Sequence, residues 1–169
     1  MHQMFQMMAR YNRWANAKLY DAAQALPDAA YREERGAFFG SVHGTLNHLV
    51  VTDRIWMHRF TGDGPTHARL EERPYRDLPT LRAAREVVDE RIVAWTEGLD
   101  PATLTGTFTY RPVTNPRDIT QPLAPAMMHF FNHQAHHLGQ VHCLLTQLAG
   151  EAPSLDLIYY QRETGDGLA

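Results

Sequence analysis

Four long stretches of the chain repeat apolar residues at helical spacing, and this pattern constrains the fold more than any other feature of the sequence. They run over residues 3–26, 38–60, 81–99 and 123–148. Pro27, Gly62 and Gly150 stand where three of these stretches stop, as expected for helix ends. Each helix has one apolar side to bury, so together they predict an all-α four-helix bundle.

The connections between the helices differ in length. The link after the first helix is short, whereas residues 63–80 are rich in Pro, Gly and charge and predict a long loop. Residues 100–122 contain four prolines, an alternating TFTY stretch and the turn signal Asn115-Pro116, so we expect an irregular crossing with a short strand pair. Unequal connections allow a crossover topology, which the residues alone do not fix. The apolar residues 155–160 predict a short docking helix.

Composition and charge exclude several classes of protein. The 169 residues suit a single domain, 1–169. A net charge of -3, with no basic cluster, argues against a nucleic-acid partner. No apolar run approaches the roughly 20 residues that span a membrane, and the first residues do not resemble a signal peptide. Cys143 is the single cysteine, so no intramolecular disulfide can form, and we expect a cytoplasmic protein.

The segment HFFNHQAHHLGQVH, residues 129–142, holds five of the ten histidines. On a helix turning about 100° per residue, His142 points away from the others and His136 lies toward solvent. His133 and His137 border the apolar side, four residues apart, a spacing that aims two imidazoles at one ion. His129 and His133 have the same spacing, so spacing alone does not choose between His129 and His137.

A metal site in a bundle needs a second helix, and His48 supplies the candidate. It lies at the edge of the apolar side of the second predicted helix. Three imidazoles leave a vacant position on an ion, which is typical of catalytic rather than structural sites. The alternative is that these histidines bond backbone carbonyls or form a polar cap. A diiron site is excluded because Glu-x-x-His motifs are absent, and Cys143 is too far along the helix to pair with His136.

Two polar residues fall among apolar ones and should have buried partners. Asp53 lies close to the middle of the apolar side of its helix, so it should meet an arginine, a histidine N–H or a backbone donor. Asn12 lies within the apolar side of the first helix, which favours a structural hydrogen bond to a neighbouring helix.

Four segments in order resemble the DinB/YfiT-like family of small four-helix-bundle metalloproteins, which is unrelated to the DNA polymerase that shares the DinB name. They are YNRWAN at 11–16, GTLNHLVVTDRIW at 44–56, HFFNHQAHHLGQVH at 129–142 and DLIYYQR at 156–162. The resemblance covers nearly the whole chain. It implies an up-down-down-up topology, a homodimer, and a divalent metal held by His48, His133 and His137.

The resemblance leaves His129 as a residue of the pocket or one that contacts a ligand. One departure stands out, because related sequences often have an arginine where this chain has Leu138. That change removes a cation able to pair with a carboxylate or an anionic substrate.

The resemblance also implies a chemistry, since characterised relatives include thiol-dependent transferases and a thiol-dependent isomerase. The first hypothesis is therefore a transferase that uses a divalent ion, zinc or nickel, to activate a low-molecular-weight thiol cosubstrate for attack on a small electrophilic substrate. Asp53 would then orient a ligand or a neighbouring helix. The alternatives are a noncatalytic, dimeric metal-binding stress protein, in which His129 is a fourth ligand, and a metal-dependent hydrolase with Asp53 as the general base.

Overall fold

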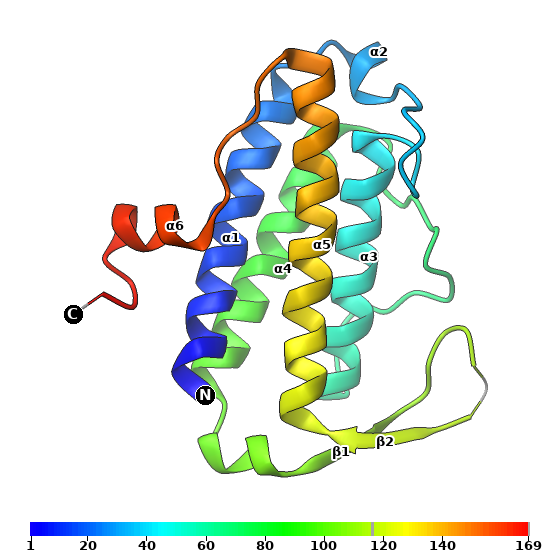
Figure 1. The fold of residues 1–169 in the computed structure, drawn as a ribbon. Helices are drawn as coiled ribbons and strands as arrows, with labels where there is room; N and C mark the ends of the chain where they lie inside the picture. Colours follow the sequence, from blue (N-terminus) through cyan, green and yellow to red (C-terminus); the bar gives the residue numbers. More distant parts are fainter. Residues whose placement is uncertain (116, 169) are drawn as a thin grey trace.

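The computed structural model describes residues 1–115 and 117–168, and four long helices dominate it (Figure 1). Each lies where the apolar periodicity predicts a helix, and the all-α prediction is confirmed. The four are α1 (His2–Gln24), α3 (Val42–Thr61), α4 (Leu78–Gly98) and α5 (Leu123–Ala149).

The four helices form a bundle in which α1 and α3 lie at opposite corners. α1 contacts α4 and α5, and α3 contacts the same two helices. Figure 1 shows that α1 and α5 run in one direction while α3 and α4 run in the other. The up-down-down-up topology implied by the family resemblance is therefore confirmed. It makes α3 and α5 antiparallel neighbours.

Polar caps and left-handed glycines set the ends of these helices. Ser41 precedes α3, and its hydroxyl accepts a hydrogen bond from the backbone N–H of Gly44 at 3.1 Å. Asp77 does the same for α4 with the N–H of Thr80 at 2.9 Å. Gly62 and Gly150 end α3 and α5 with φ of 72° and 82°.

The second helix begins later than its apolar pattern predicts. Residues 38–41, expected to be helical, instead belong to a turn closed by a bridge between Ala37 and Gly40. Gly40 has a φ of 83°, which a helix does not allow. A short helix that the sequence pattern did not reveal, α2 (Asp28–Tyr31), precedes this turn. The turn is important for the site because it places the ring of Phe39 against that of His48 on α3.

The predicted crossing before the last long helix contains a small strand pair. A 3-10 helix, η1 (Pro101–Thr105), leads into β1 (Thr107–Tyr110), which pairs antiparallel with β2 (Ile119–Pro122). The strand pair confirms that prediction. The turn expected at Asn115-Pro116 extends outside the described residues. Among the residues that are described, no helix is long and apolar enough to cross a membrane.

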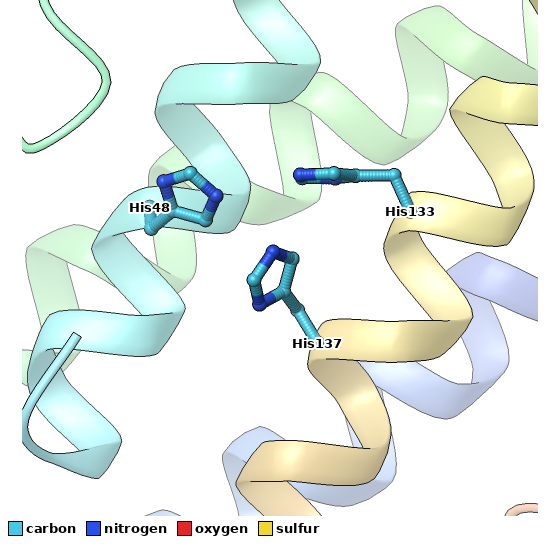
Figure 2. A group of neighbouring side chains, drawn as sticks. All are labelled: His48, His133 and His137. Carbon is cyan, nitrogen blue, oxygen red and sulfur yellow. The ribbon is translucent and has the colours of Figure 1, made fainter. Parts of the chain in front are cut away.

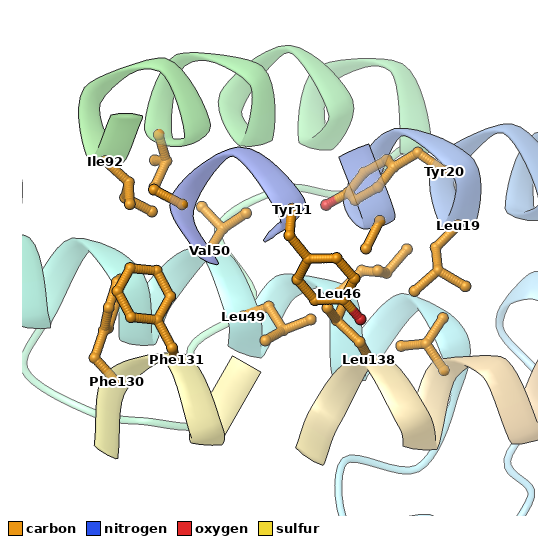
Figure 3. Close-up of a cluster of buried hydrophobic side chains, with 14 of the residues drawn as sticks. Tyr11, Leu19, Tyr20, Leu46, Leu49, Val50, Ile92, Phe130, Phe131 and Leu138 are labelled. Atoms are coloured by element: carbon orange, nitrogen blue, oxygen red, sulfur yellow. The ribbon is translucent and has the colours of Figure 1, made fainter. Parts of the chain in front are cut away.

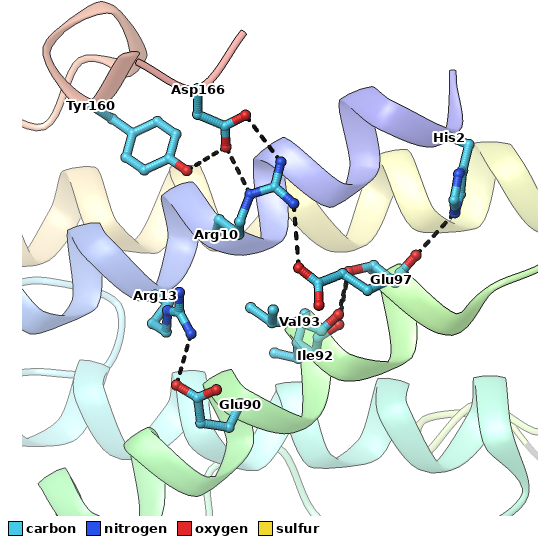
Figure 4. Close-up of polar contacts among 10 residues, drawn as sticks. His2, Arg10, Arg13, Glu90, Ile92, Val93, Glu97, Tyr160 and Asp166 are labelled. Carbon is cyan, nitrogen blue, oxygen red and sulfur yellow. Dashed lines mark hydrogen bonds and ion pairs between the residues drawn. The ribbon is translucent and has the colours of Figure 1, made fainter. Parts of the chain in front are cut away.

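The predicted docking helix is present as α6 (Leu157–Thr164), and it lies against α1 (Figure 4). Arg10 of α1 donates from Nε and Nη2 to the two carboxylate oxygens of Asp166, at 2.8 and 3.0 Å. The hydroxyl of Tyr160 donates to the same carboxylate at 2.5 Å. This bidentate pair joins the C-terminal segment to the bundle and holds the pKa of Asp166 below its ordinary value.

Apolar side chains from all four helices fill the interior of the bundle (Figure 3). Leu19, Leu46 and Leu138, on three different helices, are each at most 2% exposed. Burying a side chain of this size contributes about 1.5–3 kcal/mol to stability. The core therefore fixes the relative positions of α3 and α5, the two helices that carry the candidate site.

A charged layer crosses this apolar core. Asp53 of α3 is fully buried and pairs with Nη1 of Arg85 on α4 at 2.5 Å, while Gln134 of α5 donates to its other oxygen at 2.9 Å. Arg85 also contacts Asp89 at 3.0 Å. Asn12 of α1 donates to Asp89 at 3.3 Å. Both polar residues found among apolar ones in the sequence thus have the buried partners that were expected.

Candidate metal centre

Three histidines from α3 and α5 meet at the interface of these two helices (Figure 2). His48 comes from α3, and His133 and His137 come from successive turns of α5. One ring nitrogen of each lies within 4.8 Å of those of the other two, so the cluster could hold a metal ion. The antiparallel contact between α3 and α5 and the four-residue spacing on α5 together produce this arrangement.

Hydrogen bonds on the outer side of the rings fix the protonation of two of these histidines. Nδ1 of His48 lies 3.0 Å from the backbone carbonyl of Leu70 in the loop after α3, and a carbonyl can only accept. Nδ1 of His137 lies 2.8 Å from Oε1 of Gln140, whose amide nitrogen contacts His136 at 3.2 Å. In both rings Nδ1 therefore carries the proton, which leaves the lone pair on Nε2.

The donor set fits a divalent ion. Nε2 of His48 is buried and has no hydrogen-bond partner among the described residues. A buried acceptor with no donor is costly in a folded protein, and a cation satisfies it. Three neutral imidazoles suit zinc, nickel, copper and iron alike.

Burial keeps the three imidazoles neutral. Desolvation is the main cause in each case, and it lowers the pKa of His48 to about 4 and that of His133 to about 3. The pKa of His137 is also lowered, and its hydrogen bond to Gln140 opposes the shift. At neutral pH no proton therefore competes with a metal for these ring nitrogens.

The cluster is covered on one side and open on another. The ring of Phe39 stacks on His48 with a centroid distance of 3.6 Å and an interplanar angle of 19°, and it meets the ring of His137 edge-on at 5.5 Å. His48 and His137 are buried, whereas His133 is half-buried. The exposed approach to the cluster therefore lies on the side of His133 and the exposed His129.

The structure separates the remaining histidines of the segment from the cluster. His129 is exposed, its ring centroid lies 6.0 Å from that of His133, and it packs against Trp56 at 5.2 Å. His136 is exposed, as the helical geometry predicted. Of the two histidines spaced four from His133, the structure therefore brings His137 rather than His129 to His48.

Two further residues singled out in the sequence lie in the core rather than at the cluster. Asp53 contacts Arg85 and Gln134 rather than any of the three histidines, so it joins neighbouring helices. Leu138, the departure from the related sequences, is 2% exposed and packs in the core (Figure 3). An arginine at that position would point into the apolar core.

Sequence reasoning missed three groups that support the cluster: Phe39, the Leu70 carbonyl and Gln140. Gln140 had a usable signal, because a residue three positions after His137 lies beside it on the same helix. Phe39 and the Leu70 carbonyl had none, since their positions depend on a turn and a loop that no periodic pattern describes.

A three-histidine cluster between antiparallel helices of an up-down-down-up bundle defines a class of small helical proteins with a potential metal centre. Comparison with known sequences agrees with this class. The sequence model of the DinB family matches residues 1–167, and the chain belongs to this family. It is also 22% identical over 151 residues to the protein named Protein DinB of Bacillus subtilis (strain 168), an alignment that covers 81% of each chain.

Proposed function

We propose that His48, His133 and His137 bind a divalent ion, zinc or nickel, and that the protein is a metal-dependent transferase of low-molecular-weight thiols. The unpartnered Nε2 of buried His48 supports the metal site most directly. Three protein ligands would leave a position free for a substrate, as in catalytic sites.

The overall reaction joins a thiol to an electrophilic carbon. The sulfur's electron pair forms the new bond, the bond from that carbon to its leaving group breaks with its pair going to the leaving group, and the thiol proton passes to solvent. A bound divalent ion supplies Lewis acidity, which lowers the pKa of a thiol and raises its thiolate fraction at neutral pH.

The protein's own residues hold and shield this centre. The Leu70 carbonyl and Gln140 orient two imidazoles through their Nδ1 protons. Phe39 stacks on His48 and excludes water from that side of the cluster. The half-buried His133 faces the side from which a thiol and an electrophile can approach.

The two alternative functions have less support in the geometry. A noncatalytic site would use His129 as a fourth ligand, yet its ring lies against Trp56 and outside the cluster. A hydrolase would need a general base beside the ion, and Asp53 is committed to Arg85 and Gln134. Thiol chemistry needs neither group, which favours the transferase.

Thiol consumption tests this proposal. Protein loaded anaerobically with zinc or nickel is expected to accelerate the loss of glutathione, bacillithiol or mycothiol in the presence of 1-chloro-2,4-dinitrobenzene, followed with a thiol reagent. Metal-free protein and His133→Ala should show only the uncatalysed rate, because the first lacks the ion and the second lacks one of its three proposed ligands. If the loaded protein accelerates the loss of none of the three thiols, the transferase proposal is wrong.

A further inference from the structure

A basic pocket lies beside the last turns of α3. Its volume is about 410 Å³, and its walls come from α3, the loop that follows it, and β1 with the residues after it. Arg59, Arg111, His58 and His67 line it, together with uncharged side chains and no acidic ones. The residues that line the pocket carry positive or no charge, so the wall that an anion would meet is basic.

Arg59 is the unusual member of this pocket. Its guanidinium stacks on two aromatic rings, 4.6 Å from the centroid of Trp56 and 4.8 Å from that of Tyr110. No carboxylate of the described residues forms an ion pair with it. Half-burial lowers the pKa of Arg59, which shows that its charge is partly desolvated. A desolvated charge without a counter-charge is costly, and cation–π contacts offset only part of that cost.

The other polar groups of the pocket differ in whether they already have a hydrogen-bonding or ion-pair partner. Arg111 is held by Asp118 at 2.8 Å. Nδ1 of His67 donates to the Glu72 carboxylate at 2.9 Å, which leaves a lone pair rather than a proton on its buried Nε2. Of the two arginines that line the pocket, Arg59 is thus the one without an ion pair among the described residues.

The pocket lies on the same side of α3 as His48. His48, Thr52, Ile55 and Arg59 follow one another at spacings of four, three and four residues, which aligns them along one helix face. The loop after α3 contacts both places, since the Leu70 carbonyl bonds His48 while His67 lines the pocket.

A row of rings connects the open side of the cluster with this pocket. The ring centroids of His133 and His129 are 6.0 Å apart, and those of His129 and Trp56 are 5.2 Å apart. The guanidinium of Arg59 stacks on the ring of Trp56. At 1.5 Å per residue, Ile55 and Arg59 lie about 10 and 16 Å along α3 from His48. Three extended residues span about 10 Å, which reaches the near wall of the pocket at Ile55. The guanidinium of Arg59 lies back over Trp56, about one turn nearer to His48 than its own backbone, so a molecule of tripeptide size bridges the two places.

We propose that Arg59 binds a carboxylate of the thiol cosubstrate whose sulfur reacts at the histidine cluster. The identity of the ligand as a thiol rests on the proposed function, but the carboxylate site does not. The pocket would therefore select thiols that carry a carboxylate about 10 Å from the sulfur over thiols without one. Arg59 is a specificity-determining residue in this arrangement.

Binding without metal tests the carboxylate site by itself. Metal-free protein is titrated with S-methylglutathione, which has no free thiol, and the guanidinium Nε–H and tryptophan indole signals are followed by NMR. Saturable shifts of the Arg59 and Trp56 signals are expected. Arg59→Gln should weaken binding at least about 10-fold, the effect of losing one charge-assisted hydrogen bond. Arg59→Lys, which keeps the charge, should lose less.

Two controls separate recognition of the carboxylate from general effects. Arg54→Gln removes another arginine of α3, whose guanidinium stacks on Tyr75 at 5.3 Å from the ring centroid. Because Arg54 lies outside the pocket, this variant should bind S-methylglutathione as the wild-type protein does. The dimethyl ester of S-methylglutathione should bind weakly to every variant. Equal affinity of Arg59→Gln and wild type, or wild-type protein that shows no saturable shift, would overturn the inference.

Turnover then distinguishes the two proposals. In the metal-loaded enzyme Arg59→Gln should raise the KM for glutathione about 10-fold, leave the KM for cysteamine unchanged, and change kcat little. If the protein binds the carboxylate but shows no turnover, the transferase proposal is wrong and the proposed carboxylate site stands. Turnover whose glutathione KM does not respond to Arg59→Gln would refute the pocket and leave the transferase.

Discussion

His133→Ala is expected to bind zinc or nickel at least about 100-fold more weakly than the wild-type protein. Removing even an outer hydrogen-bond partner of a ligating histidine typically costs about 10- to 100-fold in metal affinity, and losing the ligand itself should cost more. Burial lowers the pKa of His133 to about 3, so its ring is a neutral imidazole at neutral pH and one of its nitrogens keeps a free lone pair. Anaerobic titration against a chromophoric chelator, with elemental analysis of the stoichiometry, measures the effect.

His136→Ala is the matched control for this measurement. His136 lies on the same helix, three residues after His133, and is exposed and outside the cluster. Its removal should leave both affinity and stoichiometry close to wild type. Gln140→Ala should fall between the two, because it removes the acceptor of the His137 Nδ1 proton. A His133→Ala protein that keeps full stoichiometry and wild-type affinity would contradict the proposed site.

The helices could be predicted because each buries one side, and burial leaves a period of 3.6 residues in the sequence. The same geometry separated His136 and His142 from the histidines at the edge of the core. It could not choose between His129 and His137, because both are four residues from His133. That choice depends on where α3 lies along α5, a tertiary relation that came from the family resemblance and that the structure now shows.

Local patterns also failed where a turn or a loop decides the position. Phe39 falls in a stretch whose apolar residues continue the pattern of α3, yet Gly40 and the bridge to Ala37 place it in a turn. The Leu70 carbonyl belongs to the backbone, which carries no residue-specific signal. Both groups contact His48, so the surroundings of the cluster were less predictable than its three histidines.

The partner of Asp53 was only partly predictable. Its burial required a donor, but the chain has fifteen arginines. Arg85 could have been found, because Leu81, Arg85, Val88 and Ile92 follow one helical side and an arginine on that side must be buried. Arg85 was missed because the prediction of this helix used only its apolar residues. When a charged residue lies in the apolar stripe of one helix, its partner is therefore best sought as an oppositely charged residue in the apolar stripe of another helix.

Arg85→Met is expected to destabilise the protein by about 3–5 kcal/mol at pH 7. The substitution keeps most of the side-chain volume but leaves Asp53 and Asp89 buried without their counter-charge, and breaking a buried ion pair by removing one partner has a cost of this size. Urea unfolding of metal-free protein followed by circular dichroism measures it. Arg82→Met is the control, because Arg82 lies one turn earlier on α4, is partly exposed and pairs only with the exposed carboxylates of Asp21 and Glu86, so its loss should cost at most about 1 kcal/mol.

The pH dependence of the free energy of unfolding of Arg85→Met gives a second test of the charged layer. Burial raises the pKa of Asp89 from 3.8 to about 6 even with Arg85 opposing the shift, and Asp53 is also raised. Without Arg85 both values should rise further in the folded state. A carboxyl group whose folded pKa exceeds its unfolded pKa stabilises the protein at low pH, and this contribution is lost as the pH rises through the folded pKa. The deficit in the free energy of unfolding of Arg85→Met relative to wild type should therefore be smaller at pH 5 than at pH 7. A deficit that is the same at both pH values, or below about 1 kcal/mol, would show that the charged layer does not hold α3 and α4 together.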